Sequence, residues 1–188
     1  MPSLSGRINC HRYHNIQKQN PTTKMSTSTP IPISLNHPPD LQTRDDIIDA
    51  LYRAVLGFDT TDTRLFDSAL FPDSTFDLFG NVMKGLPAIH TECFDKISKL
   101  DTTHFLSNIR VSMVEGDPNK AKVTASTLAQ HYRPGEGNVD DTSRLLGGAF
   151  YYCDVERDVA GDGLWKLRNW VIKLIWTEGD KGVMKGDG

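Results

Sequence analysis

The order of helical and strand patterns along the chain predicts an α+β fold, a cone in which about three helices and a curved antiparallel sheet enclose an apolar pocket. Two observations carry this prediction. Two helical segments, a short strand and a third helical segment precede four long strands joined by polar, Gly- or Pro-bearing turns, which favours antiparallel pairing of consecutive strands. One long strand also alternates between a face of small residues and a polar face. The small face predicts space between the sheet and the helices.

The first helix is predicted for residues 43–57. Apolar residues recur there at spacings of three and four, which gives the helix one buried face. Thr43 is suited to cap its start, and Gly57 is suited to end it. The apolar positions are Ile47, Ile48, Leu51, Tyr52, Val55 and Leu56.

Three shorter elements follow the first helix. Asp62 is suited to cap a second helix, which Pro72 stops. Residues 74–79 are typical of a short strand, and a Gly-Asn turn follows them. Pro87 then opens a third helix.

The long strands are predicted for residues 104–114, 121–133, 148–157 and 165–176. In the second of these, alternation places one set of mostly small residues on the inner face: Ala121, Val123, Ala125, Thr127, Ala129 and His131. The space beside them is either room for a ligand or is filled by large side chains such as Phe58, Phe76, Tyr151 or Trp170. The pattern alone favours filling, and it directs His131 inward.

The chain has 188 residues, which fits one domain with extensions. Residues 1–42 hold six of the ten prolines, few apolar residues and no helical period, so we predict a disordered extension. This extension is basic and weakly resembles a mitochondrial transit peptide, with a start at Met25 as the alternative. We favour an extension without function, a cytoplasmic protein, a domain over residues 43–177, and a flexible tail over residues 178–188.

Charge and cysteine usage exclude several classes of function. The formal net charge is −3, so there is no positive field to attract nucleic acid, and no apolar run is long enough to span a membrane. Cys10, Cys93 and Cys153 lack the spacing of a zinc site or a disulfide framework. His90 and Glu92 are two positions apart in a helix, so we assign them to a solvated surface rather than to a metal site.

Three residues form the candidate catalytic site. His131 projects inward by alternation, His104 opens the first long strand, and Asp59 follows the first helix. Asp59 is positioned to accept a hydrogen bond from His131 and so fix its tautomer. A carboxylate and two imidazoles beside an apolar pocket suit general acid and base catalysis near neutral pH.

Several short motifs, in this order and spacing, make the chain resemble the SnoaL-like branch of the NTF2-like superfamily and, within it, the scytalone dehydratases. They are Gly-Phe-Asp (57–59), Phe-Asp-Leu-Phe-Gly (76–80), Thr-His-Phe-Leu-Ser-Asn (103–108), Ala-Gln-His-Tyr (129–132) and Gly-Leu-Trp-Lys-Leu (163–167). The resemblance places Asp59, His104 and His131 on the family's catalytic aspartate and histidines. Phe58 and Leu78 stand where that family has tyrosines, which predicts a different substrate.

The resemblance implies an enzyme without metal or organic cofactor, a dehydratase or cyclase of fungal-type secondary metabolism acting on a polyketide- or terpenoid-derived ring. His131, oriented by Asp59, would move the proton while His104 holds an oxygen or a water. The alternatives are a pericyclase acting through a quinone methide, an isomerase, and a non-catalytic binding module. The predicted substrate-binding wall consists of Tyr52, Phe58, Phe79, Met83, Phe105, Tyr132, Tyr151 and Trp170.

Two further expectations concern partners and the chain end. Related cones often pair through the outer face of their sheet, so a homo-oligomer, a dimer or a trimer, is expected. The polar, Gly-rich tail after Trp176 either folds over the pocket mouth as a lid or frays.

Overall fold

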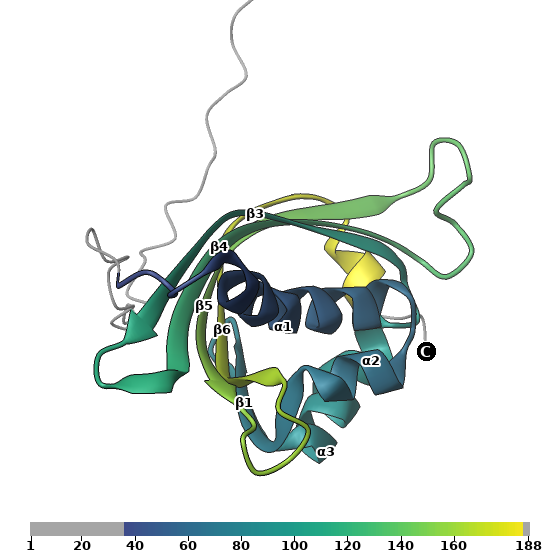
Figure 1. Ribbon diagram of the computed structural model, residues 1–188. Helices are drawn as coiled ribbons and strands as arrows, with labels where there is room; N and C mark the ends of the chain where they lie inside the picture. The colour runs from purple at the N-terminus through teal and green to yellow at the C-terminus, as the bar shows by residue number, and fades with distance from the viewer. Residues whose placement is uncertain (1–35, 186–188) are drawn as a thin grey trace, which may run out of the picture.

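The computed structural model describes residues 36–185 (Figure 1). Most of the predicted N-terminal extension, and the last three residues of the predicted tail, lie outside these residues. Within them, helices cover one face of a curved, unclosed six-stranded sheet, so the α+β prediction is confirmed. No helix of the described part is long and apolar enough to cross a membrane.

Helix α1 spans Leu41–Asp59 and begins two residues earlier than predicted. Its cap is Asp40, whose carboxylate accepts the backbone N–H of Thr43 at 2.6 Å. Gly57 does not end the helix, because the helix continues to Asp59. A Cβ at Gly57 would lie 2.6 Å from the Cβ of Phe66, so this glycine lets the next helix pack closely.

The short elements follow the predicted order. Helix α2 spans Thr63–Ser68 and is capped by Asp62 as predicted, with Oδ1 accepting the N–H of Leu65 at 2.9 Å. Strand β1 covers Leu70–Leu78 and pairs with the short strand β2, Asn81–Lys84, which sequence reasoning missed.

The third helical segment is divided into three parts. Helix α3 spans Leu86–Ile89 with Pro87 in its first turn, a π-helical turn covers His90–Phe94, and helix α4 spans Asp95–Ile97. The His90 side chain is about one-fifth exposed and its Nε2 lies 2.6 Å from Oδ1 of Asp67. The expectation of a solvated His90 is therefore wrong, because the turn packs this ring against the aromatic rings of α2 and of its own segment.

The sheet has the order β2-β1-β6-β5-β4-β3. Its long strands are β3 (Asp101–Val114), β4 (Asp117–Tyr132), β5 (Arg144–Arg157) and β6 (Trp165–Gly179), and they pair antiparallel as predicted. Strand β1 instead pairs parallel with β6, so the sheet is mixed rather than wholly antiparallel. After β2, the third helical segment carries the chain across to the opposite edge of the sheet, where β3 begins. The chain then returns through β4 and β5, so that β6 comes to lie beside β1.

The inner face of the sheet closes at one end and opens at the other. Along β4 the predicted alternation is confirmed, and the inner residues are buried. Their exposed fraction rises from 1% at Ala121 and 0% at Val123 to 7% at Thr127, 9% at Ala129 and 7% at His131. The cone is thus sealed near the start of β4 and reachable by solvent near its end.

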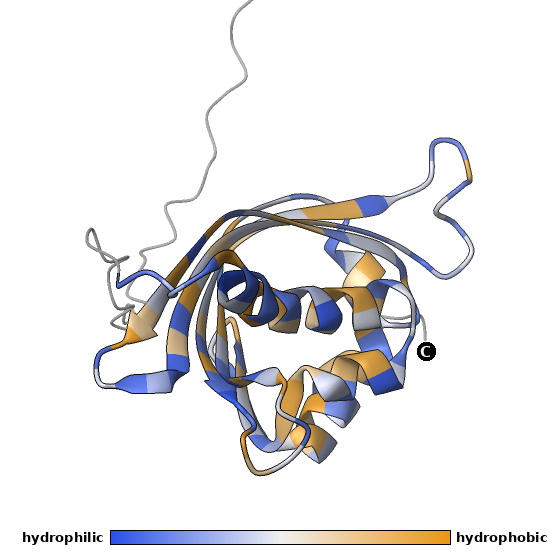
Figure 2. Ribbon diagram, viewed as in Figure 1, coloured by the Kyte–Doolittle hydropathy of each residue, from blue (hydrophilic) through white to orange (hydrophobic). Residues whose placement is uncertain are grey.

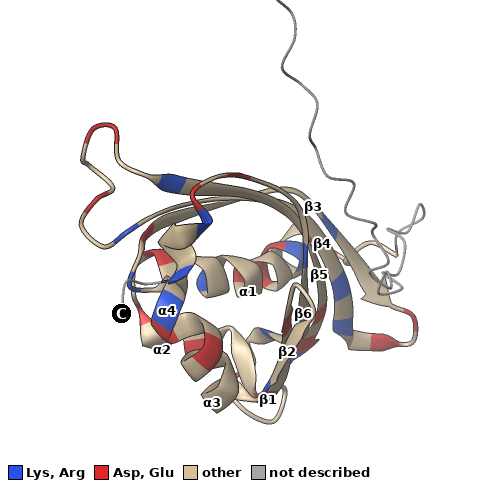
Figure 3. Ribbon diagram, turned by 180° about the vertical axis from the view of Figure 1, so that it is seen from behind, with Lys and Arg blue, Asp and Glu red and all other residues tan. Residues whose placement is uncertain are grey.

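Polar and charged residues are distributed over the outside. Apolar segments of α1 alternate with hydrophilic ones, as expected of a helix with one buried face (Figure 2). Acidic and basic residues are interspersed over the face shown in Figure 3.

The end of the described chain folds back onto the sheet. A 3₁₀ helix, η2, covers Lys181–Lys185, and the side chain of Val183 is fully buried. Asp180 donates its N–H to the carbonyl of Arg144 and accepts from the Arg133 guanidinium, both at 2.9 Å. These contacts hold η2 beside the ends of β4 and β5 that are nearest His131.

Candidate active site

The structure brings the three candidate residues together. Asp59 is the last residue of α1, His104 lies on β3 and His131 lies on β4. In the β3–β4 register, Thr102 pairs with His131 and His104 pairs with Ala129, so both histidines lie on the inner face. The centroids of the two imidazole rings are 5.4 Å apart.

Asp59 holds His104 at two points. One carboxylate oxygen accepts from Nδ1 of His104 at 2.7 Å, and the other accepts the backbone N–H of the same residue at 2.9 Å. The side chains are only 11% and 8% exposed. With its hydrogen on Nδ1, the neutral ring of His104 presents the lone pair of Nε2 as a proton acceptor.

This pairing corrects the predicted hydrogen bond between Asp59 and His131. Strand β3 is at the edge of the sheet, so alternate N–H groups on it have no strand partner. The carboxylate at the end of α1 accepts a hydrogen bond from one such N–H group, that of His104, and a second one from the imidazole of the same residue. This position on β3 is why Asp59 binds His104 rather than His131.

Thr102 orients His131. The Thr102 hydroxyl donates to the carbonyl of Gln130 at 3.0 Å and also lies 2.7 Å from Nδ1 of His131. A hydroxyl has one hydrogen and a carbonyl can only accept, so Nδ1 of His131 must be the donor to Thr102. The Nε2 of His131 therefore also carries a lone pair.

Burial keeps His131 neutral. Its pKa is lowered from 6.5 to about 4, mainly by desolvation and secondarily by the nearby His104, while Asp59 acts in the opposite direction. At neutral pH the ring of His131 is thus neutral, and its Nε2 accepts a hydrogen bond instead of donating a proton as an imidazolium would. The two histidines differ in partner, one bound by a carboxylate and the other by a hydroxyl.

Half of the predicted wall residues lie in the interior. Phe58, Met83, Tyr151 and Trp170 are buried. The ring of Phe58 is 5.8 Å from that of His104 and 6.3 Å from that of Trp170, and Trp170 is 5.3 Å from Tyr151 (centroid distances). An aromatic layer therefore runs from the histidines across to β6.

The structure does not bring the other four wall residues to this place. Phe105 and Tyr132 fall on the outer face by strand alternation, and Phe79 lies in the β1–β2 turn with a positive φ of 57°. Tyr52 lies on an exposed side of α1. Phe79 and Phe105 are more than half exposed.

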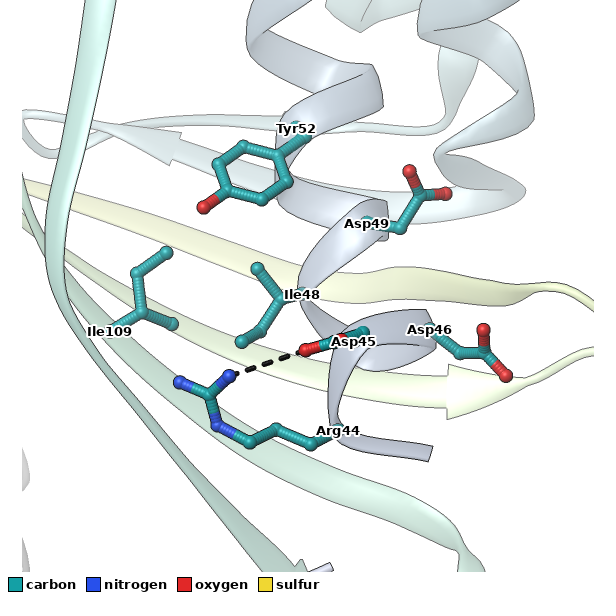
Figure 4. A pocket seen from close by; sticks show the side chains of 7 residues that line it. All are labelled: Arg44, Asp45, Asp46, Ile48, Asp49, Tyr52 and Ile109. Carbon is teal, nitrogen blue, oxygen red and sulfur yellow. Dashed lines mark hydrogen bonds and ion pairs between the residues drawn. The ribbon is translucent and has the colours of Figure 1, made fainter. Parts of the chain in front are cut away.

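Tyr52 lines a different feature, an open groove of about 410 Å³ between the first half of α1 and β3 (Figure 4). Its lining is Arg44, Asp45, Asp46, Ile48, Asp49, Tyr52 and Ile109. Arg44 is paired with Asp45 at 3.3 Å. None of the three candidate residues borders this groove, so the chemistry of Asp59 and the histidines belongs to a separate part of the molecule.

Sequence reasoning missed Thr102. Its signal is the Thr-x-His spacing, which places Thr102 and His104 on the same face of β3. That spacing becomes informative only once the register sets Thr102 opposite His131.

Comparison with known proteins places the fold in a family. A family model described as a SnoaL-like domain matches residues 39–171, most of the described chain. The chain belongs to the SnoaL-like domain family. This membership confirms the resemblance drawn from the motifs. A fungal relative, the terrestric acid biosynthesis cluster protein E of Penicillium crustosum, is 48% identical over 153 residues, which are 81% of this chain and 95% of that protein.

Solved structures share the fold. A hexachlorocyclohexane dehydrochlorinase (LinA) of type 2 superposes with a TM-score of 0.62 at 20% identity, covering 76% of this chain and 92% of its own. A protein of Novosphingobium aromaticivorans provisionally named a scytalone dehydratase gives a TM-score of 0.62 at 19% identity, covering 74% and 89%. At these identities the similarity concerns the SnoaL-like fold alone.

Proposed function

We propose that this SnoaL-like protein is a cofactor-free dehydratase or cyclase, acting by acid–base catalysis on a polyketide- or terpenoid-derived cyclic intermediate of secondary metabolism. The observation that carries the proposal is the two-point contact of Asp59 with His104 beside the neutral His131. A carboxylate-bound imidazole is a competent general base near neutral pH. The relative named for the biosynthesis of a fungal metabolite supports the pathway context.

In the proposed reaction, Nε2 of His104 removes a proton from the carbon next to a carbonyl group of the substrate. The carboxylate of Asp59 stabilises the imidazolium that forms. For a dehydration, the electron pair of the broken C–H bond forms the new double bond as the C–O bond to the neighbouring carbon breaks. His104 then returns its proton to the departing hydroxyl, which leaves as water.

His131 has the complementary role in this proposal. Its neutral Nε2 accepts a hydrogen bond from a substrate hydroxyl or from an ordered water and holds that group near His104. These roles reverse the ones expected from the sequence, in which His131 moved the proton. The reversal follows from the partner of Asp59, which is His104.

Deletion of the gene in its native host tests the proposal. We expect an intermediate to accumulate that the purified protein converts in buffer without added metal or cofactor. An intermediate heavier than the product by one water indicates a reaction that includes dehydration, whereas equal masses indicate an isomerisation or a cyclisation without loss of water. An unchanged metabolite profile after deletion, or an intermediate that the protein leaves untouched, would contradict an enzymatic role.

A further inference from the structure

Four inner-face positions between the histidines and β6 form a platform of unusually small size, which we call the floor. On β4 these are Thr127 and Ala129, and in the β4–β5 register they pair with Ala149 and Gly147. Three of the four carry nothing beyond Cβ. His104 lies directly across from Ala129 on β3, so the floor adjoins the proposed base.

The floor is slightly accessible to solvent. Thr127, Ala129 and Ala149 are 7%, 9% and 7% exposed, whereas inner residues further along the same strands, Val123 and Val155, are fully buried. A Cβ built at Gly147 would meet only a methyl group of Leu174, at 3.9 Å. The floor is therefore at the open end of the cone rather than in its sealed core.

One polar atom on the floor has no partner. The hydroxyl of Thr127 is one of two buried side-chain polar atoms in residues 36–185 without a hydrogen bond, the other being Nε1 of Trp170. Tyr151 lies close to Thr127, and burial raises the pKa of its phenol while the Thr127 hydroxyl opposes that rise, but the two groups do not reach hydrogen-bond geometry. An unpaired buried hydroxyl destabilises a fold unless something else binds it.

We propose that the ring of the substrate lies on the floor of Thr127, Ala129, Gly147 and Ala149, and that Thr127 binds an oxygen of that ring remote from the reacting carbon. The inference rests on the proposed function, whose active site it extends. Thr127 is the diagonal cross-strand neighbour of His104, at a Cβ separation of roughly 7 Å. Such a separation suits one ring with oxygens on two sides, and the lack of side chains at three floor positions suits a flat ring.

Fragment binding followed by NMR of the backbone amides tests this without requiring turnover. The probes are resorcinol, a flat ring with two oxygens, and phenol, which has only one. Resorcinol should bind roughly five- to tenfold more tightly than phenol, the value of one additional neutral hydrogen bond. Both probes should shift the amides of Ala129, Gly147 and Ala149.

Two variants separate the hydroxyl from the shape of the side chain. Thr127→Val keeps the branched shape and should lose the preference for resorcinol, while Thr127→Ser keeps the hydroxyl and should retain it. The melting temperature of Thr127→Val should equal or exceed that of the wild type, because no hydrogen bond within the protein is lost. If Thr127→Val does not fold, Thr127→Ala takes its place.

A preference for resorcinol that survives Thr127→Val would overturn the proposal, as would equal binding of both probes or floor amides that neither probe shifts. The proposed function is tested separately through Asp59→Asn, which should abolish turnover. That variant should keep the Thr127-dependent preference for resorcinol. A wrong catalytic assignment and a wrong ring-binding site therefore give different results.

Discussion

At the scale of single residues, the site depends on which atom of each imidazole carries the hydrogen. Asp59 fixes this for His104, and Thr102 fixes it for His131 through one hydroxyl that donates to Gln130 and accepts from the ring. Both rings consequently present the lone pair of Nε2. Thr102 acts through His131 and is therefore a positioning residue in the proposed mechanism.

Replacement of Thr102 tests that role. In Thr102→Val the Nδ1–H of His131 loses its acceptor, so we expect a mixture of tautomers and a kcat/KM lowered roughly tenfold. ¹⁵N NMR of the ring nitrogens reports the tautomer directly. Thr102→Ser should retain a single tautomer, and a wild-type tautomer in Thr102→Val would show that Thr102 does not set it.

The low pKa of His131 has a consequence for stability. The unfolded chain binds a proton at this residue below about pH 6.5, whereas the folded chain does so only near a pKa of about 4. Stabilisation from the neutral ring is therefore complete above pH 6.5 and is lost as the pH falls toward 4. We expect this residue to lower the free energy of unfolding by about 2 to 3 kcal/mol across that interval.

Denaturant unfolding of the wild type and of His131→Asn, at about pH 7 and about pH 4.5, measures this loss. The wild type should lose more stability than the variant between the two conditions. Equal losses in both proteins would show that His131 is not kept neutral by the fold.

The inward direction of His131 was predictable, but the partner of Asp59 was not. Strand alternation is a local property, so the face of His131 follows from the sequence around it. The contact between Asp59 and His104 depends on where the end of α1 meets the edge strand β3, residues that are 45 positions apart. The local sequence pattern therefore does not predict which histidine contacts Asp59.

At the scale of elements, Gly57 shows how one residue sets the packing of two helices. The sequence pattern offered it as a helix terminator, whereas its missing side chain admits Phe66 of α2 into close contact. A glycine at this position was recognised as structurally important, but its role is to permit close helix packing, which depends on the tertiary structure. The short strand β2 and the π-helical turn were not predicted because each is too short to show a period.

Gly57→Ala should lower the free energy of unfolding by roughly 1 to 3 kcal/mol, because the added methyl group has no room beside Phe66. Gly147→Ala is the matched control, since its Cβ meets nothing closer than 3.9 Å, and we expect a change within about 0.5 kcal/mol. Thermal or denaturant unfolding measures both. Equal effects in the two variants would contradict the packing described for Gly57.

At the scale of the whole molecule, the sequence predicted the layers and the open cone but not the complete sheet. The four long strands were identified because each has a long pattern and a turn on either side. The parallel pairing of β1 with β6 joins segments about 100 residues apart. Topology of that kind is set by how the helices close over the sheet rather than by any local signal.

The outer face of the sheet carries an apolar row. The row crosses four strands in register and consists of Phe105, Leu128, Gly148 and Trp176. The side chains of Phe105, Leu128 and Trp176 are 59%, 37% and 45% exposed. Contiguous apolar side chains of this kind are typical of interfaces. We expect a second copy of the chain to cover them, in line with the homo-oligomer predicted from the sequence.

Light scattering of the purified protein measures the oligomer. Phe105→Glu should shift the mass toward a monomer, while Val159→Glu, at an exposed residue in the β5–β6 loop, should leave it unchanged. A monomeric wild type, or a Phe105→Glu variant with the mass of the wild type, would exclude this face as the interface.

In the proposed mechanism His104, held by the carboxylate of Asp59, moves the proton of the reaction. The most direct test is the rate at which Asp59→Asn converts the intermediate that accumulates in the deletion strain. We predict a fall of roughly one hundred- to ten-thousand-fold with an unchanged fold by circular dichroism. A folded Asp59→Asn variant that turns over at the wild-type rate would rule out this role of Asp59 and His104.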